Sequence, residues 1–266
     1  MEFLPLPRLM TKQRKGLHRQ IEIALWLREF RYSSPAVIGK LIGVEGPYNG
    51  NLWHLMNNMK GRGLVQDFSN EIAPRLGRLF MAGPEMATFL ELHGQEHARV
   101  VTNPVYVRRC KTAYHDLNIQ LAVAHLREAG VDRVAKVESE IQMQAEDGGW
   151  LKPDVLLTNA AGKRVAMEYE MTRKANVRVY HTFAGHLHAI RSGLYSGVKY
   201  LFPNERLADT YRALFEASAW PNTLRANDGR VYVHGEAYDP DVIHGGGSAA
   251  RKQYISFGVE CYLQPV

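Results

Sequence analysis

Three acidic residues near the middle of the chain have a spacing that suits metal ligands. Asp154 precedes the apolar segment 155–157, and Glu168 and Glu170 follow in a segment that alternates like a strand. Residues two apart on a strand point to the same face, so Glu168 and Glu170 share one. If Asp154 projects from a neighbouring strand onto that face, three carboxylates repel one another and a divalent cation is their natural partner. Mg²⁺, or Mn²⁺ in its place, would activate water there for attack on a phosphodiester.

The segments around these acids have the periodicity of helices and strands in alternation. A wide apolar arc on residues 114–128 indicates a helix that is buried against a sheet. Strand-like segments that hold the acids are followed by a helix, a strand, a helix and a final strand. The sequence therefore predicts an α/β (α+β) fold, with helices at 114–128, 175–192 and 204–217 and strands at 134–143, 150–158, 164–172, 198–202 and 230–234.

Lys152-Pro153-Asp154, followed by Glu168-Tyr169-Glu170, resembles the motif of the PD-(D/E)xK nuclease superfamily, and the element order over residues 105–203 matches that fold. The resemblance implies a restriction-endonuclease-like mixed sheet flanked by helices and a Mg²⁺-dependent DNA endonuclease. Asp154 and Glu168 would be the metal ligands, and Glu170 would be a ligand or the base that orients water. The catalytic candidates are therefore Asp154, Glu168, Glu170 and, on the first strand, Glu140.

One position departs from the family pattern. The family usually has a lysine where this chain has Glu170, although some restriction endonucleases of the superfamily carry an acid there and are active. Lys152 or Lys174 would then supply the cation, and His115 or Asp116 on the first helix would add to the metal site. Pro-Asp and Glu-x-Glu are also short enough to occur by chance, in which case the acids are a solvated strand face.

His186-Leu187-His188 offers a competing interpretation. It matches the His-hydrophobic-His signature of relaxases and rolling-circle initiators, in which two histidines of one strand bind a metal and a tyrosine attacks the phosphate. The surrounding residues, however, keep a helical apolar stripe, and positions two apart on a helix diverge too far to chelate one ion. We therefore expect a helix here, with these histidines lining the site or the surface.

The first 95 residues have a different pattern, of short helices separated by Gly, Pro and Asn. The expected helices are 17–31, 36–42, 51–60 and 85–92, and the expected strands are 64–66 and 75–81. This order, with NNMKGRGLVQ and GRLFMAGPEMATFLEL, resembles the winged helix-turn-helix superfamily. The resemblance implies a third helix in a DNA major groove, or else a domain for protein contacts alone. The DNA-binding candidates are Asn51, His54, Asn57, Asn58, Lys60, Arg62, Arg75 and Arg78.

The distribution of charge supports a division into two domains. The 33 Lys and Arg exceed the 27 Asp and Glu, and the formal net charge of +6 favours an anionic partner. Most of this excess lies before residue 95, so we expect a winged-helix domain at 1–95 and a nuclease-like domain at 96–266. No apolar run reaches the roughly 18–20 residues of a membrane span, and two cysteines suit a reducing cytoplasm.

The whole layout, with YEMTRKANVRVYHTF, is similar to the replication-relaxation proteins of bacterial plasmids and integrative elements. That similarity implies a cytoplasmic protein that processes the DNA of a mobile element. The expected partner is double-stranded DNA, and a homodimer is the default assembly. The alternative is a non-catalytic DNA-binding regulator, or an accessory factor in mobilisation or replication, whose nuclease-like domain is degenerate.

Overall fold

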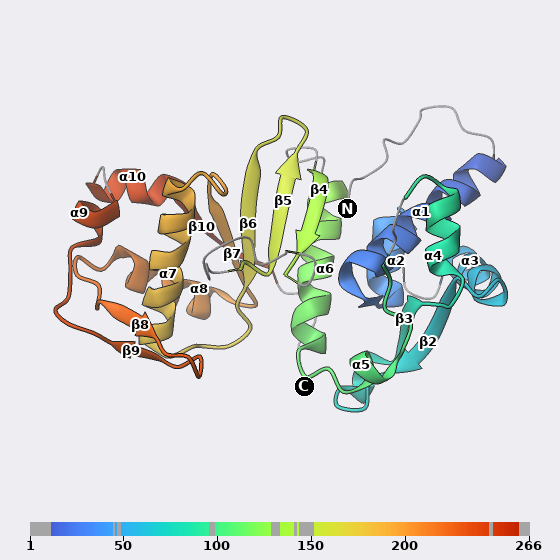
Figure 1. Cartoon of the computed structure of the whole chain (residues 1–266), viewed down its shortest axis with the longest axis horizontal. Coiled ribbons are helices and arrows are strands. Elements are labelled where there is room, and N and C mark those ends of the chain that lie inside the picture. The colour runs from blue at the N-terminus through green and yellow to red at the C-terminus, as the bar shows by residue number, and fades with distance from the viewer. Residues whose placement is uncertain are drawn as a thin grey trace. The chain divides into compact units, whose positions relative to one another are not determined.

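The computed structural model of the chain describes residues 12–44, 46, 49–95, 99–128, 134–140, 143, 152–244 and 247–260. Two compact units are distinguished by their internal contacts, Met1–Gln142 with Pro265–Val266, and Met143–Gln264. Helices and strands mix in both units, and the larger sheet is mixed and flanked by helices, which confirms the predicted α/β class (Figure 1). In the described part of the chain, no helix has the length and apolar character needed to cross a membrane.

Helices surround a small antiparallel sheet at the start of the first unit, with the strand order β1-β3-β2. Ser34 and Asn49 begin two of these helices, because their side chains accept hydrogen bonds from backbone N–H groups of the first turn. A Cβ on Gly83 would lie 2.2 Å from the Gly63 carbonyl oxygen, so only glycine fits this close approach. The elements are α1 (Lys12–Phe30), β1 (Tyr32–Ser33), α2 (Pro35–Leu41), α3 (Gly50–Gly61), β2 (Val65–Ser69), β3 (Arg78–Ala82) and α4 (Met86–Leu92).

A long helix also belongs to the first unit. In α6 (Ala113–Glu128), the buried Gln120 accepts hydrogen bonds from the Trp26 indole at 3.0 Å and the Ser33 hydroxyl at 2.7 Å, and donates one to the Tyr32 carbonyl. These bonds join α6 to α1 and β1, and the first unit extends to Gln142, beyond the division expected after residue 95. The remaining elements are the 3₁₀ turn η1 (Pro74–Leu76), α5 (Val105–Arg108) and β4 (Val134–Ser139).

In the second unit the strand order is β10-β7-β6-β5. Strand β7 is parallel to both β10 and β6, whereas β5 is antiparallel to β6, so the sheet is mixed. Since parallel neighbours need a crossover, α7 connects β6 to β7. The elements are β5 (Val155–Asn159), β6 (Arg164–Tyr169), α7 (Asn176–Arg191), β7 (Val198–Phe202), α8 (Glu205–Glu216), β8 (Thr223–Arg225), β9 (Val231–Val233), α9 (Pro240–His244), α10 (Gly247–Tyr254) and β10 (Ile255–Val259).

Aromatic side chains fill the core between this sheet and the helices α7 and α8. Phe183 of α7 is fully buried, with edge-on or tilted contacts to Tyr200 of β7, Phe215 of α8 and Trp220. Tyr200 pairs in register with Glu168, so the face of the sheet that carries Glu168 is the one that these helices cover. The predicted acidic face is therefore packed, and the interpretation of a solvated strand face is wrong.

Several predicted elements differ at their ends. Strand β6 ends at Tyr169 rather than 172, although the Glu170 N–H still donates to the Leu201 carbonyl at 2.9 Å. The sequence Gly245-Gly246-Gly247-Ser248 is typical of a flexible loop. Residues 247 and 248 instead begin helix α10, and 245 and 246 lie outside the described residues. Of the strand expected at 150–158, residues 150 and 151 lie outside the described residues, and the observed strand β5 begins at Val155.

Candidate functional site

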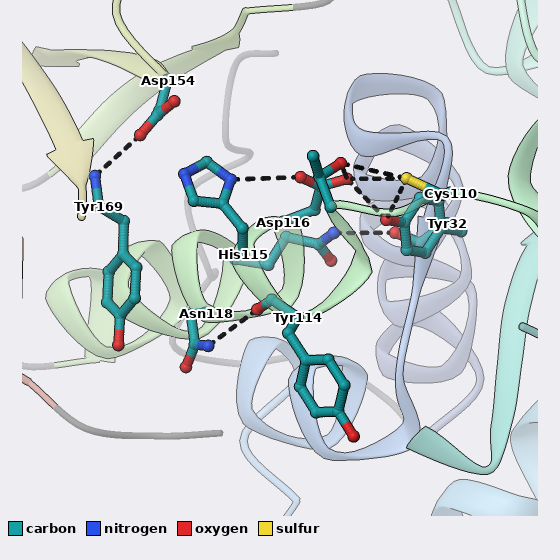
Figure 2. A network of polar contacts seen from close by, with 10 residues as sticks. Tyr32, Cys110, Tyr114, His115, Asp116, Asn118, Asp154 and Tyr169 are labelled. Carbon is teal, nitrogen blue, oxygen red and sulfur yellow. Dashed lines mark hydrogen bonds and ion pairs between the residues drawn. The ribbon is translucent and has the colours of Figure 1, made fainter. Parts of the chain in front are cut away.

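Asp154 and Glu168 lie opposite each other where β5 and β6 meet. Val155 pairs with Met167 in this antiparallel ladder, so the next pair outward is Asp154 and Glu168. The Asp154 carboxylate accepts a hydrogen bond of 2.8 Å from the Tyr169 N–H (Figure 2). One of its oxygens is therefore held by the backbone of the neighbouring strand.

Glu168 and Glu170 are both buried, with 6% and 3% of their surface exposed. Glu168 Oε1 lies 3.1 Å from Nε2 of His186, which projects from α7. Glu170 Oε1 accepts a hydrogen bond of 2.6 Å from Lys174 Nζ, four residues on. Each glutamate therefore has a nitrogen partner from α7 or from the segment that leads into it.

His186 also contacts the phenol of Tyr195. Its Nδ1 lies 2.6 Å from the Tyr195 hydroxyl, and its side chain is fully buried. Burial lowers the pKa of His186 to about 3, an effect that the Lys174 charge reinforces and the Asp154 charge opposes. Burial and then the charge of Glu168 raise the pKa of Tyr195. At neutral pH the imidazole and the phenol are both uncharged, so an uncharged imidazole lies between the Tyr195 hydroxyl and the Glu168 carboxylate.

Lys174, and not Lys152, is the lysine at the acidic cluster. The Lys174 amine bonds Glu170, the position at which the nuclease motif usually has lysine itself. The Lys152 amine instead donates to the Met143 carbonyl at 3.0 Å. We call Asp154, Glu168, Glu170, Lys174 and His186 the acidic cluster.

The other residues expected near the metal lie in the first unit. Asp116 accepts hydrogen bonds from the Tyr32 hydroxyl at 2.6 Å and the Thr112 hydroxyl at 3.1 Å, and His115 Nδ1 lies 3.4 Å from its second oxygen (Figure 2). Burial and this carboxylate raise the pKa of Tyr32. Glu140 is exposed and directly follows β4. These side chains have partners of their own, and the hydrogen bonds of Asp116 tie α6 to β1.

Carboxylate oxygens are the donors that Mg²⁺ prefers, and the acidic cluster contains three carboxylates. Among the side chains that the structure describes, no group of three or more His, Cys, Asp or Glu is placed so that it could hold a metal. Oε1 of Glu168 lies beside His186 Nε2, and Oε1 of Glu170 lies beside Lys174 Nζ. Of these two nitrogen groups only the Lys174 ammonium is charged at neutral pH, so it alone offsets carboxylate charge in the acidic cluster.

A second candidate site lies on α3. Leu52, Met56 and Met59 face the core at helical spacing, so the opposite side of the helix faces solvent. Every α3 residue predicted to contact DNA is exposed, namely Asn51, His54, Asn57, Asn58 and Lys60. This face presents amide, imidazole and ammonium groups to solvent.

The predicted arginines of this region are exposed too. Arg78 begins β3, and its guanidinium lies 5.1 Å from the centre of the Trp53 ring of α3. Arg62 follows α3, donates to the Gln20 side chain at 2.7 Å and lies over the Phe89 ring. Arg75 lies in η1, between β2 and β3. The Phe89 ring thus contacts Arg62 just after α3, and the Trp53 ring contacts Arg78 beside the helix.

Asp67 is a residue that sequence reasoning missed. Its carboxylate, on β2, forms an ion pair with Lys60, and its second oxygen lies 3.4 Å from Arg78 Nε. The hydrogen bond from Lys60 lowers the pKa of Asp67. Two candidate DNA-binding cations thus share one carboxylate, a contact between helix and hairpin that no spacing in the sequence reveals.

His186 could have been placed from the sequence. It lies three residues after Phe183 and seven after Val179, within the buried stripe of the predicted helix, whereas His188 is exposed. The expected helix over these histidines is confirmed, and their side chains diverge as helical geometry requires.

Comparisons with known proteins do not identify the chain. A scan against protein-family models gave no match, and neither did searches of curated proteins and of solved structures.

Proposed function

We propose that the protein binds duplex DNA through α3 and the β2–β3 hairpin, in the manner of a winged helix-turn-helix. The order of helix, short strand, two helices and two-stranded hairpin supports this proposal, as does the strand order β1-β3-β2. The observation that carries it is the exposed face of α3. Its apolar side is buried, and all the side chains assigned to DNA from the sequence project into solvent.

The chemistry of this face suits base edges and phosphates. Asparagine amides pair with adenine in the major groove, and arginine and lysine neutralise phosphates. Asn51 and Asn58 lie seven residues apart, so they share one side of the helix with His54. Arg62, Arg75 and Arg78 then flank this reading face as phosphate contacts.

Replacing Arg62, Arg75 and Arg78 together by glutamine should weaken DNA binding and its dependence on salt. Each phosphate contact contributes about 0.9 to the slope of log affinity against log salt, so the triple variant should lose about 2–3 units of slope. Fluorescence anisotropy with labelled duplexes at several salt concentrations measures both quantities. An unchanged slope would refute the proposed surface.

Asp67→Asn should change DNA affinity in the opposite direction and serves as a matched control. Since its carboxylate attracts Lys60 and Arg78, its neutralisation releases both cations for phosphate and should strengthen binding by about three- to tenfold at low salt. Glu205→Gln, an exposed acid at the start of α8, changes net charge by the same amount and should leave affinity almost unchanged.

A Mg²⁺-dependent endonuclease in the second unit is a second candidate. In its favour, Asp154 directly precedes β5, Glu168 lies in the adjoining β6 and Glu170 directly follows it, and the Lys174 amine bonds Glu170. Against it, both glutamates are buried and directed to nitrogen partners. We therefore propose a non-catalytic role for the acidic cluster, which suits a regulator or an accessory factor in mobile-element replication or mobilisation.

Plasmid nicking in millimolar Mg²⁺ or Mn²⁺ distinguishes these two candidates. We expect no metal-dependent cleavage by the wild type or by Asp154→Asn, with equal DNA affinity for both. Calorimetric titration with Mg²⁺ alone should give the same result for the wild type and for Asp154→Asn, with no Mg²⁺ binding that depends on Asp154. Cleavage by the wild type that Asp154→Asn abolishes, with DNA affinity retained, would establish the nuclease instead.

A further inference from the structure

A short segment after α4 carries basic and aromatic side chains that the α3 face does not include. Tyr106 is 73% exposed, and Arg108, Arg109 and Lys111 are exposed beside it. We call these four residues the α5 surface. Val107 points the other way and is buried, so it anchors the short helix while its neighbours face solvent.

Hydrogen bonds fix this segment to the tip of the β2–β3 hairpin. The Asn70 side chain, which is 1% exposed, donates to the carbonyls of Val107 and Cys110 at 3.2 and 3.1 Å. The Glu71 N–H donates to the Arg108 carbonyl at 2.7 Å. The buried amide therefore holds the backbone on both sides of Arg108 and Arg109.

The same hairpin tip carries Arg75, and Arg78, which pairs with Ser69 next to the tip, lies over the Trp53 ring of α3. The hairpin is thus in contact with α3 at one point and with the α5 segment at another. Each of these parts carries cationic side chains: Arg78 on β3, Arg75 in η1, and Arg108, Arg109 and Lys111 in the α5 segment. Glu71 at the hairpin tip is an acid among them, and its carboxylate lies 2.8 Å from Arg109 Nε.

We infer that the α5 surface is a second phosphate-binding surface, which contacts the backbone of the same duplex beyond the part that α3 reads. This inference rests on the proposed DNA binding and extends its footprint. Arg108 and Lys111 supply the positive charge, and the Tyr106 hydroxyl can donate a hydrogen bond to a phosphate oxygen. Glu71 positions Arg109, because the carboxylate accepts from Nε and leaves the terminal nitrogens to donate.

The double variant Arg108→Gln/Lys111→Gln tests the α5 surface on duplexes of two lengths. On a duplex of about 24 base pairs, near two helical turns, it should weaken binding about tenfold and lower the salt slope by about 2. On a duplex of about 12 base pairs, which covers the α3 region alone, it should bind as the wild type does. Fluorescence anisotropy across a salt series measures each value.

Two further variants control for folding and for net charge. Arg108→Lys/Lys111→Arg keeps both charges and should bind the longer duplex within about twofold of the wild type, since phosphate contacts depend chiefly on charge. Lys163→Gln/Arg206→Gln removes two exposed charges from the second unit and should have no effect on either duplex.

The outcomes separate this inference from the proposed function. If no duplex binds to the wild type, both fail. If the variant of Arg62, Arg75 and Arg78 loses affinity while Arg108→Gln/Lys111→Gln binds the longer duplex normally, the α5 surface alone is refuted. Loss of self-association in Tyr106→Ser, with DNA affinity unchanged, would assign the surface to a second copy of the chain and would also overturn the inference.

Discussion

Replacing Arg251 by alanine should lower the free energy of unfolding by about 3 kcal/mol, because it leaves a partly buried carboxylate without its partner. Arg251, in α10, is 3% exposed, and its Nε lies 3.1 Å from Asp241 Oδ1. Its guanidinium lies over the rings of both Phe215 and Trp220, at 5.1 and 5.2 Å from their centres. The substitution therefore removes an ion pair, two cation–π contacts and the packing of a long side chain. Urea unfolding followed by circular dichroism measures the change.

Lys252→Ala is the matched control for this prediction. Lys252 is the next residue of α10 and forms a 2.8 Å ion pair with Glu216, but 53% of its side chain is exposed. Exposed pairs contribute little, so its loss should cost less than about 1 kcal/mol. The double variant Arg251→Met/Asp241→Leu should recover most of the stability that Arg251→Ala loses, since apolar groups can replace a buried pair. Equal losses in Arg251→Ala and Lys252→Ala would contradict the assigned burial.

Periodicity predicted the elements that hold the acidic cluster. Alternation along residues 164–172 placed Glu168 on a strand, and the stripe of Val179, Phe183 and Leu187 predicted α7. Both signals are local, because they arise from the side-chain period of a single strand or helix. The shared face of Glu168 and Glu170 followed from the same period of two.

The partners of those acids could not be predicted from local pattern. Whether a strand face meets water or a helix depends on the layer that packs on it, and α7 and α8 cover the Glu168 face through the aromatic core around Phe183. Strand β10 was missed for a related reason. Its parallel pairing with β7 joins Ile255 to Val198, far apart in the sequence, and such pairing leaves no periodic signal.

On α3 the sequence was more informative about the candidate site. A helix that buries Leu52, Met56 and Met59 must expose the intervening positions, so Asn51, His54 and Asn58 could be placed from spacing alone. The pairing of Lys60 with Asp67 could not, since it depends on how β2 packs beside the end of the helix. Exposure of a cation is thus predictable from periodicity, whereas its electrostatic partner is not.

Stability should fall as the pH decreases from about 6.5, because the fold keeps His186 unprotonated. The unfolded chain binds a proton at the ordinary pKa of 6.5, whereas burial lowers the folded pKa of His186 to about 3. Between these values the unfolded state binds more protons, so the free energy of unfolding rises with pH in this window and is independent of this group above it. Lowering the pH from 7 to 5 should cost about 2 kcal/mol from this residue.

His186→Gln isolates that contribution. Glutamine can still donate toward Glu168 and accept from Tyr195, but it does not titrate, so the variant should lose about 2 kcal/mol less than the wild type between pH 7 and 5. His188→Gln, on the exposed side of the same helix, should keep the wild-type slope. Urea unfolding at pH 5, 6 and 7 gives the three slopes. If His186→Gln and the wild type had the same slope, the imidazole would be protonated beside Glu168 and would form an ion pair with it, whereas we assign a neutral imidazole.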